Sequence, residues 1–159
     1  MLLSVSIIMQ SEEEAIESIR RLKELSEKYE GHEEIVLQYA DGLVHLSYSP
    51  NEELAKESVR RLKELNEKYE GNKYIALQYA NCLVHLSSSP NEELAKERVR
   101  CLKELSEKYE GDEDIVLQYA NCLAYLSYSP NEELAKESVR RLKELSEKYK
   151  IVKILIARL

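Results

Sequence analysis

Phenylalanine and tryptophan are absent from this chain, so tyrosine supplies all 11 of its aromatic rings. Only three prolines and four glycines occur in 159 residues, so few positions can break a helix. The glycines are isolated from one another, which excludes a glycine-rich phosphate loop. The apolar start, MLLSVSIIMQ, has no basic leader and is shorter than the about 20 residues of a membrane helix. We expect long helices and no membrane partner.

A basic surface is also missing. The chain has 23 Lys and Arg against 30 Asp and Glu, a net charge of −7, and the two signs are interleaved along the sequence. Nucleic-acid binding needs a basic patch or stripe, so we expect no nucleic-acid partner. The acidic balance favours solubility instead.

A 40-residue unit is repeated along most of the chain. Residues 11–50, 51–90 and 91–130 are three copies, and a fourth runs from 131 to 149. Copies two and three are identical at 30 of their 40 positions. Repetition at this period is typical of arrays of stacked supersecondary units. The repeat therefore predicts the architecture before any single residue does.

Each unit has the pattern of a helical hairpin. Asn51 is a good N-cap, and apolar residues then recur at helical spacing up to Tyr69. Gly71 suits the position just after a helix, and Asn72 can cap the next one, where Asp112 and the weaker His32 stand in other copies. The second half of the unit has a wider apolar face. We predict an all-α solenoid of stacked antiparallel hairpins, with about seven main helices of roughly 19 or 16 residues.

The apolar motifs resemble those of the tetratricopeptide repeat. Val36-x2-Tyr39-Ala40-x2-Leu43, repeated at 76–83 and 116–123, is similar to the W-x2-L-G-x2-Y pattern of that family's first helix. Ala55-x3-Val59, repeated at 95–99 and 135–139, is similar to the A-x3-F pattern of its second helix. The unit is 40 residues rather than 34, and proline lies between the helices rather than after the second one. An armadillo or HEAT-like solenoid is the alternative.

The resemblance implies a phase and a handedness. It implies one repeat domain over 1–159 with a right-handed superhelix. Its parts would be a partial unit at 1–32, repeats at 33–72, 73–112 and 113–150, and a helical extension at 151–159. Residues 1–10 would match the tail of a first helix.

The resemblance also implies a concave groove, lined by the first helix of each repeat, that binds an extended peptide or a partner helix. We carry over that family's ligand-facing positions and add the glutamines on the same polar face of each first helix. These twelve candidates form what we call the polar stripe. They are Glu34, Gln38, Asp41 and His45; Tyr74, Gln78, Asn81 and His85; and Asp114, Gln118, Asn121 and Tyr125. Positions 34, 41 and 45 vary between copies while much of the apolar face is constant. Free drift of exposed sites is the competing explanation.

Metal and catalytic chemistry find little support. Cys82 and Cys122, like His45 and His85, are one repeat apart, about 10 Å by helix packing. This separation is too long for a disulfide, whose Cα atoms lie within about 7 Å of each other. It is also too long for two histidines to bind one zinc ion, because each ligand nitrogen must lie about 2 Å from the metal. The two cysteines, with Cys101, are expected to be reduced, in a cytoplasmic setting. The paired glutamates at each helix start serve the helix dipole. We expect no metal, no cofactor and no enzymatic activity.

The C-terminal sequence lacks a polar cap. Ile151 replaces the glycine of the other copies, so we predict that the last helix continues without a break. Its phase puts Val152, Ile156 and Leu159 on the core face. Ile151, Ile154 and Leu155 then cover the last repeat or associate with another chain.

Two functions remain open on the sequence alone. The first is a protein-interaction scaffold with a protein or peptide partner. The second is a structural or self-assembling module, designed or recently amplified, with no ligand of its own. The near-identity of the copies favours the second function, because a groove for one ligand usually varies between repeats.

Overall fold

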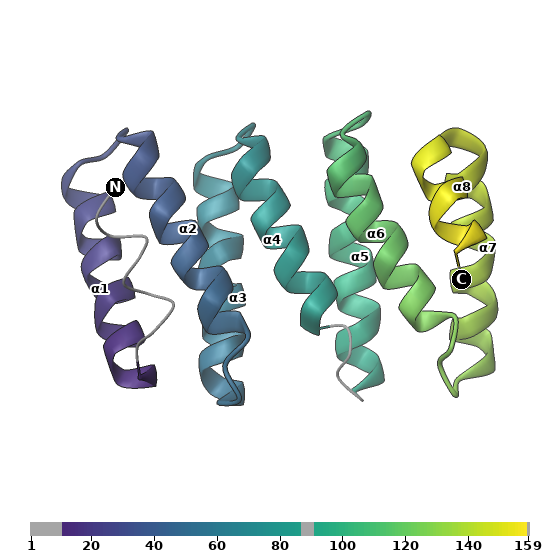
Figure 1. The fold of residues 1–159 in the computed structure, drawn as a ribbon, viewed down its shortest axis with the longest axis horizontal. Coiled ribbons are helices and arrows are strands. Elements are labelled where there is room, and N and C mark those ends of the chain that lie inside the picture. Colours follow the sequence, from purple (N-terminus) through teal and green to yellow (C-terminus); the bar gives the residue numbers. More distant parts are fainter. Residues whose placement is uncertain (1–10, 87–90, 159) are drawn as a thin grey trace. The chain divides into compact units, whose positions relative to one another are not determined.

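The computed structural model describes residues 11–86 and 91–158. Within these ranges all regular structure is helical: eight helices and no strand, with contacts between helices that are neighbours in sequence (Figure 1). The prediction of an all-α, solenoid-like fold is confirmed. The expected match of residues 1–10 to a first helix and the expected burial of Leu159 concern residues outside these ranges. The chain divides into two compact units, Met1–Cys82 and Leu83–Leu159.

The helices follow the 40-residue period. The helices that the resemblance assigns as second helices are α1 Glu12–Lys28, α3 Glu52–Lys68, α5 Glu92–Lys108 and α7 Glu132–Lys148. The first helices are α2 Glu33–Ser47, α4 Lys73–Leu86 and α6 Glu113–Leu126. A short helix, α8 Lys150–Ala157, ends the described chain.

The expected caps are present. The Asn51 side chain accepts a hydrogen bond from the Leu54 amide at 3.4 Å, and Asp112 accepts one from Ile115 at 3.2 Å. His32 makes no side-chain cap bond, as its weaker propensity predicts. Gly71 has φ of 90°, a left-handed conformation that side chains rarely adopt, which explains glycine at the end of each hairpin turn.

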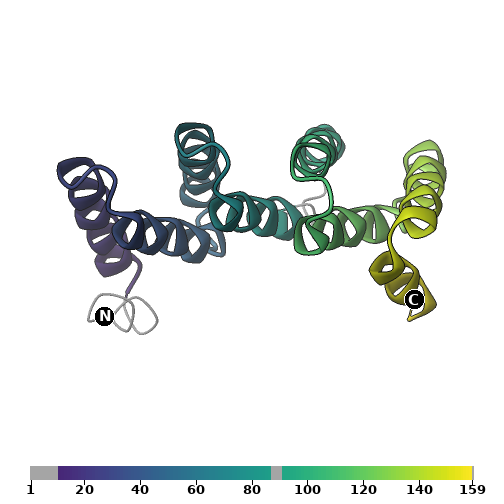
Figure 2. The ribbon, with the colours of Figure 1, turned by 90° about the horizontal axis from the view of Figure 1, so that it is seen from above.

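In each unit a first helix lies between second helices. α2 packs against α1 and α3, and α6 packs against α5 and α7 (Figure 2). This arrangement buries two sides of the first helix: in α6, Ile115, Val116 and Ala120 are fully buried. The wider apolar face that the sequence shows for these helices follows from this position.

Polar bridges join successive second helices at both ends. In the first unit the Asn51 amide donates to Glu12 at 3.4 Å, and Lys68 pairs with Glu30 at 3.3 Å. The second unit repeats the first bridge, where Asn131 donates to Glu92 at 2.6 Å. These contacts are exposed, so each adds little stability.

The tyrosines at 29, 69, 109 and 149 are less buried than their helical spacing predicts. Each lies at the C-cap of a second helix, where the chain leaves the packed face. Tyr109 is buried, but Tyr29 is 44% exposed. Lysine ammonium groups lie 5.4–5.6 Å from the ring centres of Tyr29, Tyr69 and Tyr149, so these rings serve as cation–π partners.

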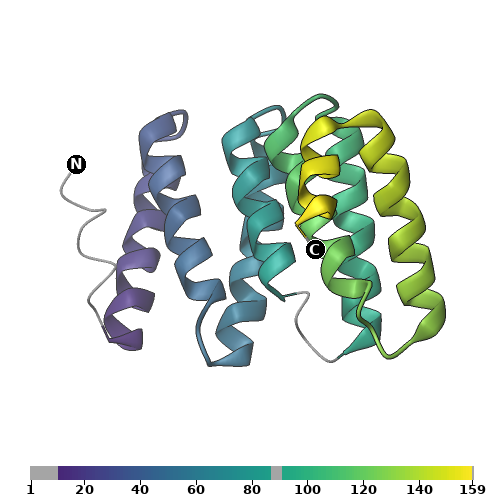
Figure 3. The same ribbon diagram turned by 45° about the vertical axis from the view of Figure 1, so that its right-hand side comes forward.

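The prediction that the last helix continues without a break is wrong. Tyr149 has an extended backbone, with φ −123° and ψ 116°, so α7 ends at Lys148 and α8 begins at Lys150. α8 folds back and packs against both α7 and α6 (Figure 3). Val152 is fully buried in this arrangement. The burial of its apolar side chain stabilises the folded-back position of α8 and so compensates for the break in the helix at Tyr149.

Candidate binding surface

The polar stripe of the first helices is accessible, as the sequence predicts. On α2, Glu34 and His45 are exposed, and Gln38 and Asp41 are partly buried. The spacing of three or four residues puts all four on one helical face. The other faces of α2 supply core residues such as Ala40 and Leu43, both fully buried. The stripe is thus the part of α2 that packing leaves available.

The same positions are accessible on the other first helices. Tyr74 and Tyr125 are 41% and 56% exposed, and Asp114 and His85 are also exposed. The remaining members of the stripe on these helices are partly buried; they are Gln78, Asn81, Gln118 and Asn121.

Two members of the stripe bind each other in the first unit. The Tyr74 hydroxyl of α4 donates a hydrogen bond to an Asp41 carboxylate oxygen of α2 at 2.7 Å. Burial, together with this bond, raises the pKa of Tyr74 to about 12. The bond occupies one polar group on each helix, so this part of the stripe is closed by an internal contact.

The α6 part of the stripe is not blocked by an internal hydrogen bond of this kind. Within the described chain, the side chains of Asp114, Gln118, Asn121 and Tyr125 make no hydrogen bond or ion pair. Carboxylate and amide groups without internal partners can accept and donate hydrogen bonds to a ligand. α6 therefore presents a row of available polar groups and one aromatic ring.

The charges of the second helices are used internally. Glu57 binds Arg60 and Arg61, and these contacts lower its pKa to about 2; Glu17 and Glu137 show the same shift with their own arginines. Glu64 also binds Arg60, and Lys68 binds Glu30. The second helices thus present paired charges, unlike the stripe on α6.

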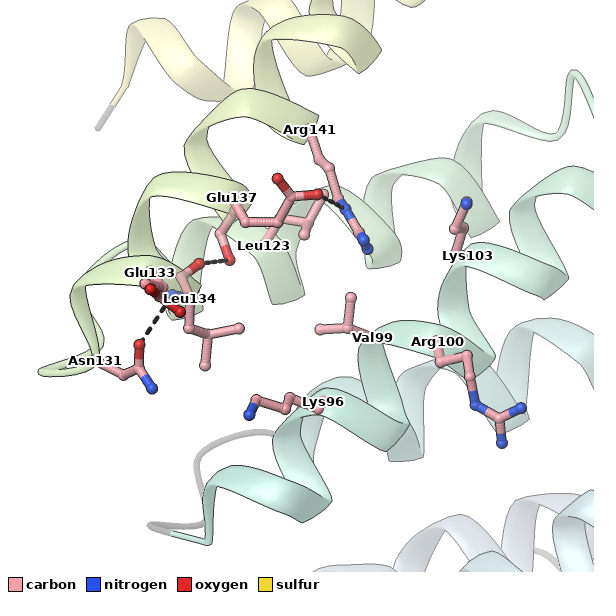
Figure 4. A pocket seen from close by; sticks show the side chains of 11 residues that line it. Lys96, Val99, Arg100, Lys103, Leu123, Asn131, Glu133, Leu134, Glu137 and Arg141 are labelled. Carbon is pink, nitrogen blue, oxygen red and sulfur yellow. Dashed lines mark hydrogen bonds and ion pairs between the residues drawn. The ribbon is translucent and has the colours of Figure 1, made fainter.

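A crevice runs between α5 and α7 in the second unit (Figure 4). Its volume is about 450 Å³. Val99 and Leu134 point toward one another across it, with Leu123 of α6 behind them. Val99 and Leu123 are only 6% and 1% exposed, so little of the apolar lining of the crevice is accessible to a ligand. None of the twelve stripe residues lines it.

Sequence reasoning did not predict this crevice. The only signal for it is the repetition of small and apolar residues on one face of the second helices. Those positions show which residues face inward, but they do not give the separation of α5 and α7.

The cysteines are all free thiols. Cys82 donates a hydrogen bond to the Ser47 hydroxyl at 3.3 Å, and burial raises the pKa of this thiol to about 11. Cys122 is buried, and Cys101 is partly exposed. In the part of the chain that the structure describes, no group of three His, Cys, Asp or Glu residues could hold a metal ion.

The C-terminal apolar residues have separate environments. Ile151 and Leu155 are partly buried on α8, which packs against α7 and α6. Ile154 is 46% exposed. Among the described helices none has both the length and the apolar character to cross a membrane.

A scan against protein-family models and a search of curated proteins both find no match to this chain.

Proposed function

We propose that this chain is a tetratricopeptide-like interaction scaffold, which binds an extended peptide or a partner helix on the polar stripe of its first helices. One observation carries the proposal. On α6 the stripe is accessible and its side chains have no internal partners, whereas the charged side chains of the second helices are largely paired with one another.

The chemistry of the stripe suits a peptide backbone. Gln118 and Asn121 each carry an amide that offers two donors and an acceptor, and they lie nearly one turn apart on α6. Tyr125 adds a rigid ring with a polar tip, a side chain that gives large contact area at low entropic cost. Such groups hold a ligand without a preformed deep pocket.

A peptide-array screen with the immobilised protein tests this proposal. The variant Asn81→Ala/His85→Ala, with Asn121→Ala added, removes stripe groups without touching the core. A matched control, Lys63→Ala/Glu67→Ala, changes exposed residues of α3. We expect the stripe variant to lose most captured peptides and the control to retain them. Retention of every peptide by the stripe variant would show that the stripe is not the binding surface.

Self-assembly is the second candidate function, and the exposure of Ile154 is the observation that favours it. A second copy could cover this side chain. Sedimentation equilibrium across protein concentrations, for the wild type and Ile154→Ser, separates this function from peptide binding. An assembly that the substitution dissociates would support it, and a monomer at every concentration would exclude it.

A further inference from the structure

Two helices of nearly the same sequence differ in how well one of their faces is covered. α5 and α7 have different residues at only two of their 17 positions. Val99 of α5 is 6% exposed, whereas the equivalent Val139 of α7 is 39% exposed. Val99 faces Leu134 of α7 across the crevice, while α8 packs on α7 and leaves Val139 accessible. α7 therefore presents, uncovered, the face on which α5 receives the next second helix.

α1 presents the opposite side of the same kind of contact. The side of α7 that lines the crevice includes Leu134 and Arg141, and the equivalent residues of α1 are Glu14 and Arg21. The side chain of Arg21 is 71% exposed, against 30% for Arg141. Both sides of one repeat contact are thus accessible in this chain, one on α1 and the other on α7.

The charges in one half of these two faces have opposite sign. The α7 positions equivalent to two lysines of the crevice are Lys136 and Lys143. Both are exposed and make no ion pair among the described residues. On α1, Glu13 and Glu14 are exposed, and their side chains make no hydrogen bond or ion pair in the described chain. The α1 face is therefore acidic where the α7 face is basic.

The other half of the contact has mixed charges. Between α5 and α7, Lys148 shares a crevice with Glu107 and pairs with Glu110. On the open face, Glu147 stands in the place of Glu107 and can attract Lys28 of an incoming α1, but the residue after Tyr149 is a lysine. That lysine is one of three exposed cations of α8, with no acid beside them; they are Lys150, Lys153 and Arg158. The end of the chain that α7 and α8 form is thus more basic than the matching face of α5, which favours the acidic start of α1.

We infer that copies of this chain associate head to tail, with α1 of one copy docked on the α7 face of another. The inference rests on the second candidate function, self-assembly, and names its two faces. Val139 is covered in this contact as Val99 is covered by α7. Each copy uses two different faces, so every added copy leaves one of each kind open. Assembly therefore continues to linear oligomers and does not stop at a dimer.

Sedimentation equilibrium from about 10 μM to about 1 mM protein tests the inference, a range that suits a small interface. We expect the average mass of the wild type to rise past that of a dimer, and to rise less in high salt. Val139→Glu puts a carboxylate opposite Glu14, and Glu14→Lys puts an ammonium opposite Lys136 and Lys143. Each substitution should weaken association about tenfold or more. Glu67→Lys, an exposed charge reversal on α3, is the matched control and should leave association unchanged.

A mixture of the two variants separates head-to-tail from symmetric association. Val139→Glu keeps an intact α1 face, and Glu14→Lys keeps an intact α7 face. The mixture should therefore form a 1:1 dimer although neither variant assembles alone, and a mixture that stays monomeric would overturn the inference. Circular dichroism checks that both variants fold. Lys143→Glu, on the same α7 face, gives the same test should Val139→Glu not fold.

The remaining outcomes also overturn the inference, each in a recognisable way. If the wild type is monomeric at every concentration, the self-assembly candidate fails with it, and the peptide-binding proposal is untouched. If Ile154→Ser dissociates the assembly while Val139→Glu and Glu14→Lys leave it intact, self-assembly stands and the two faces are wrong. If Val139→Glu dissociates the assembly and Glu14→Lys does not, the α7 face of a second copy, rather than its α1, covers Val139.

Discussion

Arg98 is a buried cation with no hydrogen bond or ion pair among the described residues, and its replacement by serine should stabilise the protein. The side chain lies in α5 and is 8% exposed, with one guanidinium nitrogen buried and unbonded. Burial lowers the pKa of Arg98, but arginine stays charged at any ordinary pH. The equivalent residues in α3 and α7 are serines, Ser58 and Ser138, which are 1% and 2% exposed.

The magnitude follows from the two alternatives at this position. Ser58 donates its hydroxyl to the Leu54 carbonyl at 2.8 Å, so serine leaves no unsatisfied group. An unsatisfied buried donor costs about 1–3 kcal/mol, and more when charged. Loss of the arginine stem removes some packing, which offsets part of this gain. We expect Arg98→Ser to raise the free energy of unfolding by about 1–2 kcal/mol.

Urea unfolding followed by circular dichroism at 222 nm measures the effect. Arg100→Ser is the control, because Arg100 is exposed and its pairs with glutamate are worth little. Ser58→Arg introduces the same cation into the first unit and should destabilise the protein by a similar amount. A neutral or destabilising Arg98→Ser would mean that the buried guanidinium is satisfied in solution, and the reasoning would be refuted.

Three other predictions follow from local contacts. A Cβ at Gly42 would lie 3.0 Å from Cγ1 of Ile19, so Gly42→Cys should destabilise by about 1–2 kcal/mol, and its cost should be smaller in an Ile19→Ala background, which lacks Cγ1, in a double-mutant cycle. The pKa of Glu57, like those of Glu17 and Glu137, is lowered to about 2. The stability from these pairs is present above pH 5 and lost between pH 5 and 2, so the urea midpoint should fall there in low salt and fall less in 0.5 M salt. Iodoacetamide at pH 8 should modify Cys101 before Cys82, because the Cys82 thiol is buried and has a pKa of about 11. Mass spectrometry of tryptic peptides measures the order of modification, and modification of Cys82 first would contradict the prediction.

The helices and their caps could be predicted because they depend on local sequence. Asn51, Asp112 and Gly71 act through backbone groups within a few residues, and the repeat shows each signal several times. The accessible stripe was also predictable, since it is what remains when the apolar face of each first helix is assigned to the core.

Other features depend on contacts that local sequence does not contain. The break at Tyr149 has no glycine or proline to mark it, and arises because Val152 gains burial when α8 folds back. The bond between Tyr74 and Asp41 joins residues 33 positions apart on two different helices, so no local sequence pattern marks it. Departures from the repeat were nevertheless visible, and Arg98, which replaces the serine of other copies, is one of them.

Those departures show how near-identical repeats can carry different surfaces. The residues that make hairpins stack, such as Leu102 and Ala120, are fully buried, and substitution there would cost stability in any copy. Residues on the stripe contact solvent, so a change there alters recognition at little cost to the fold. At one equivalent stripe position, for example, the copies carry Glu34, Tyr74 and Asp114, and the Tyr74 hydroxyl bonds Asp41. In such an array, binding specificity therefore depends on the few exposed positions that differ between copies.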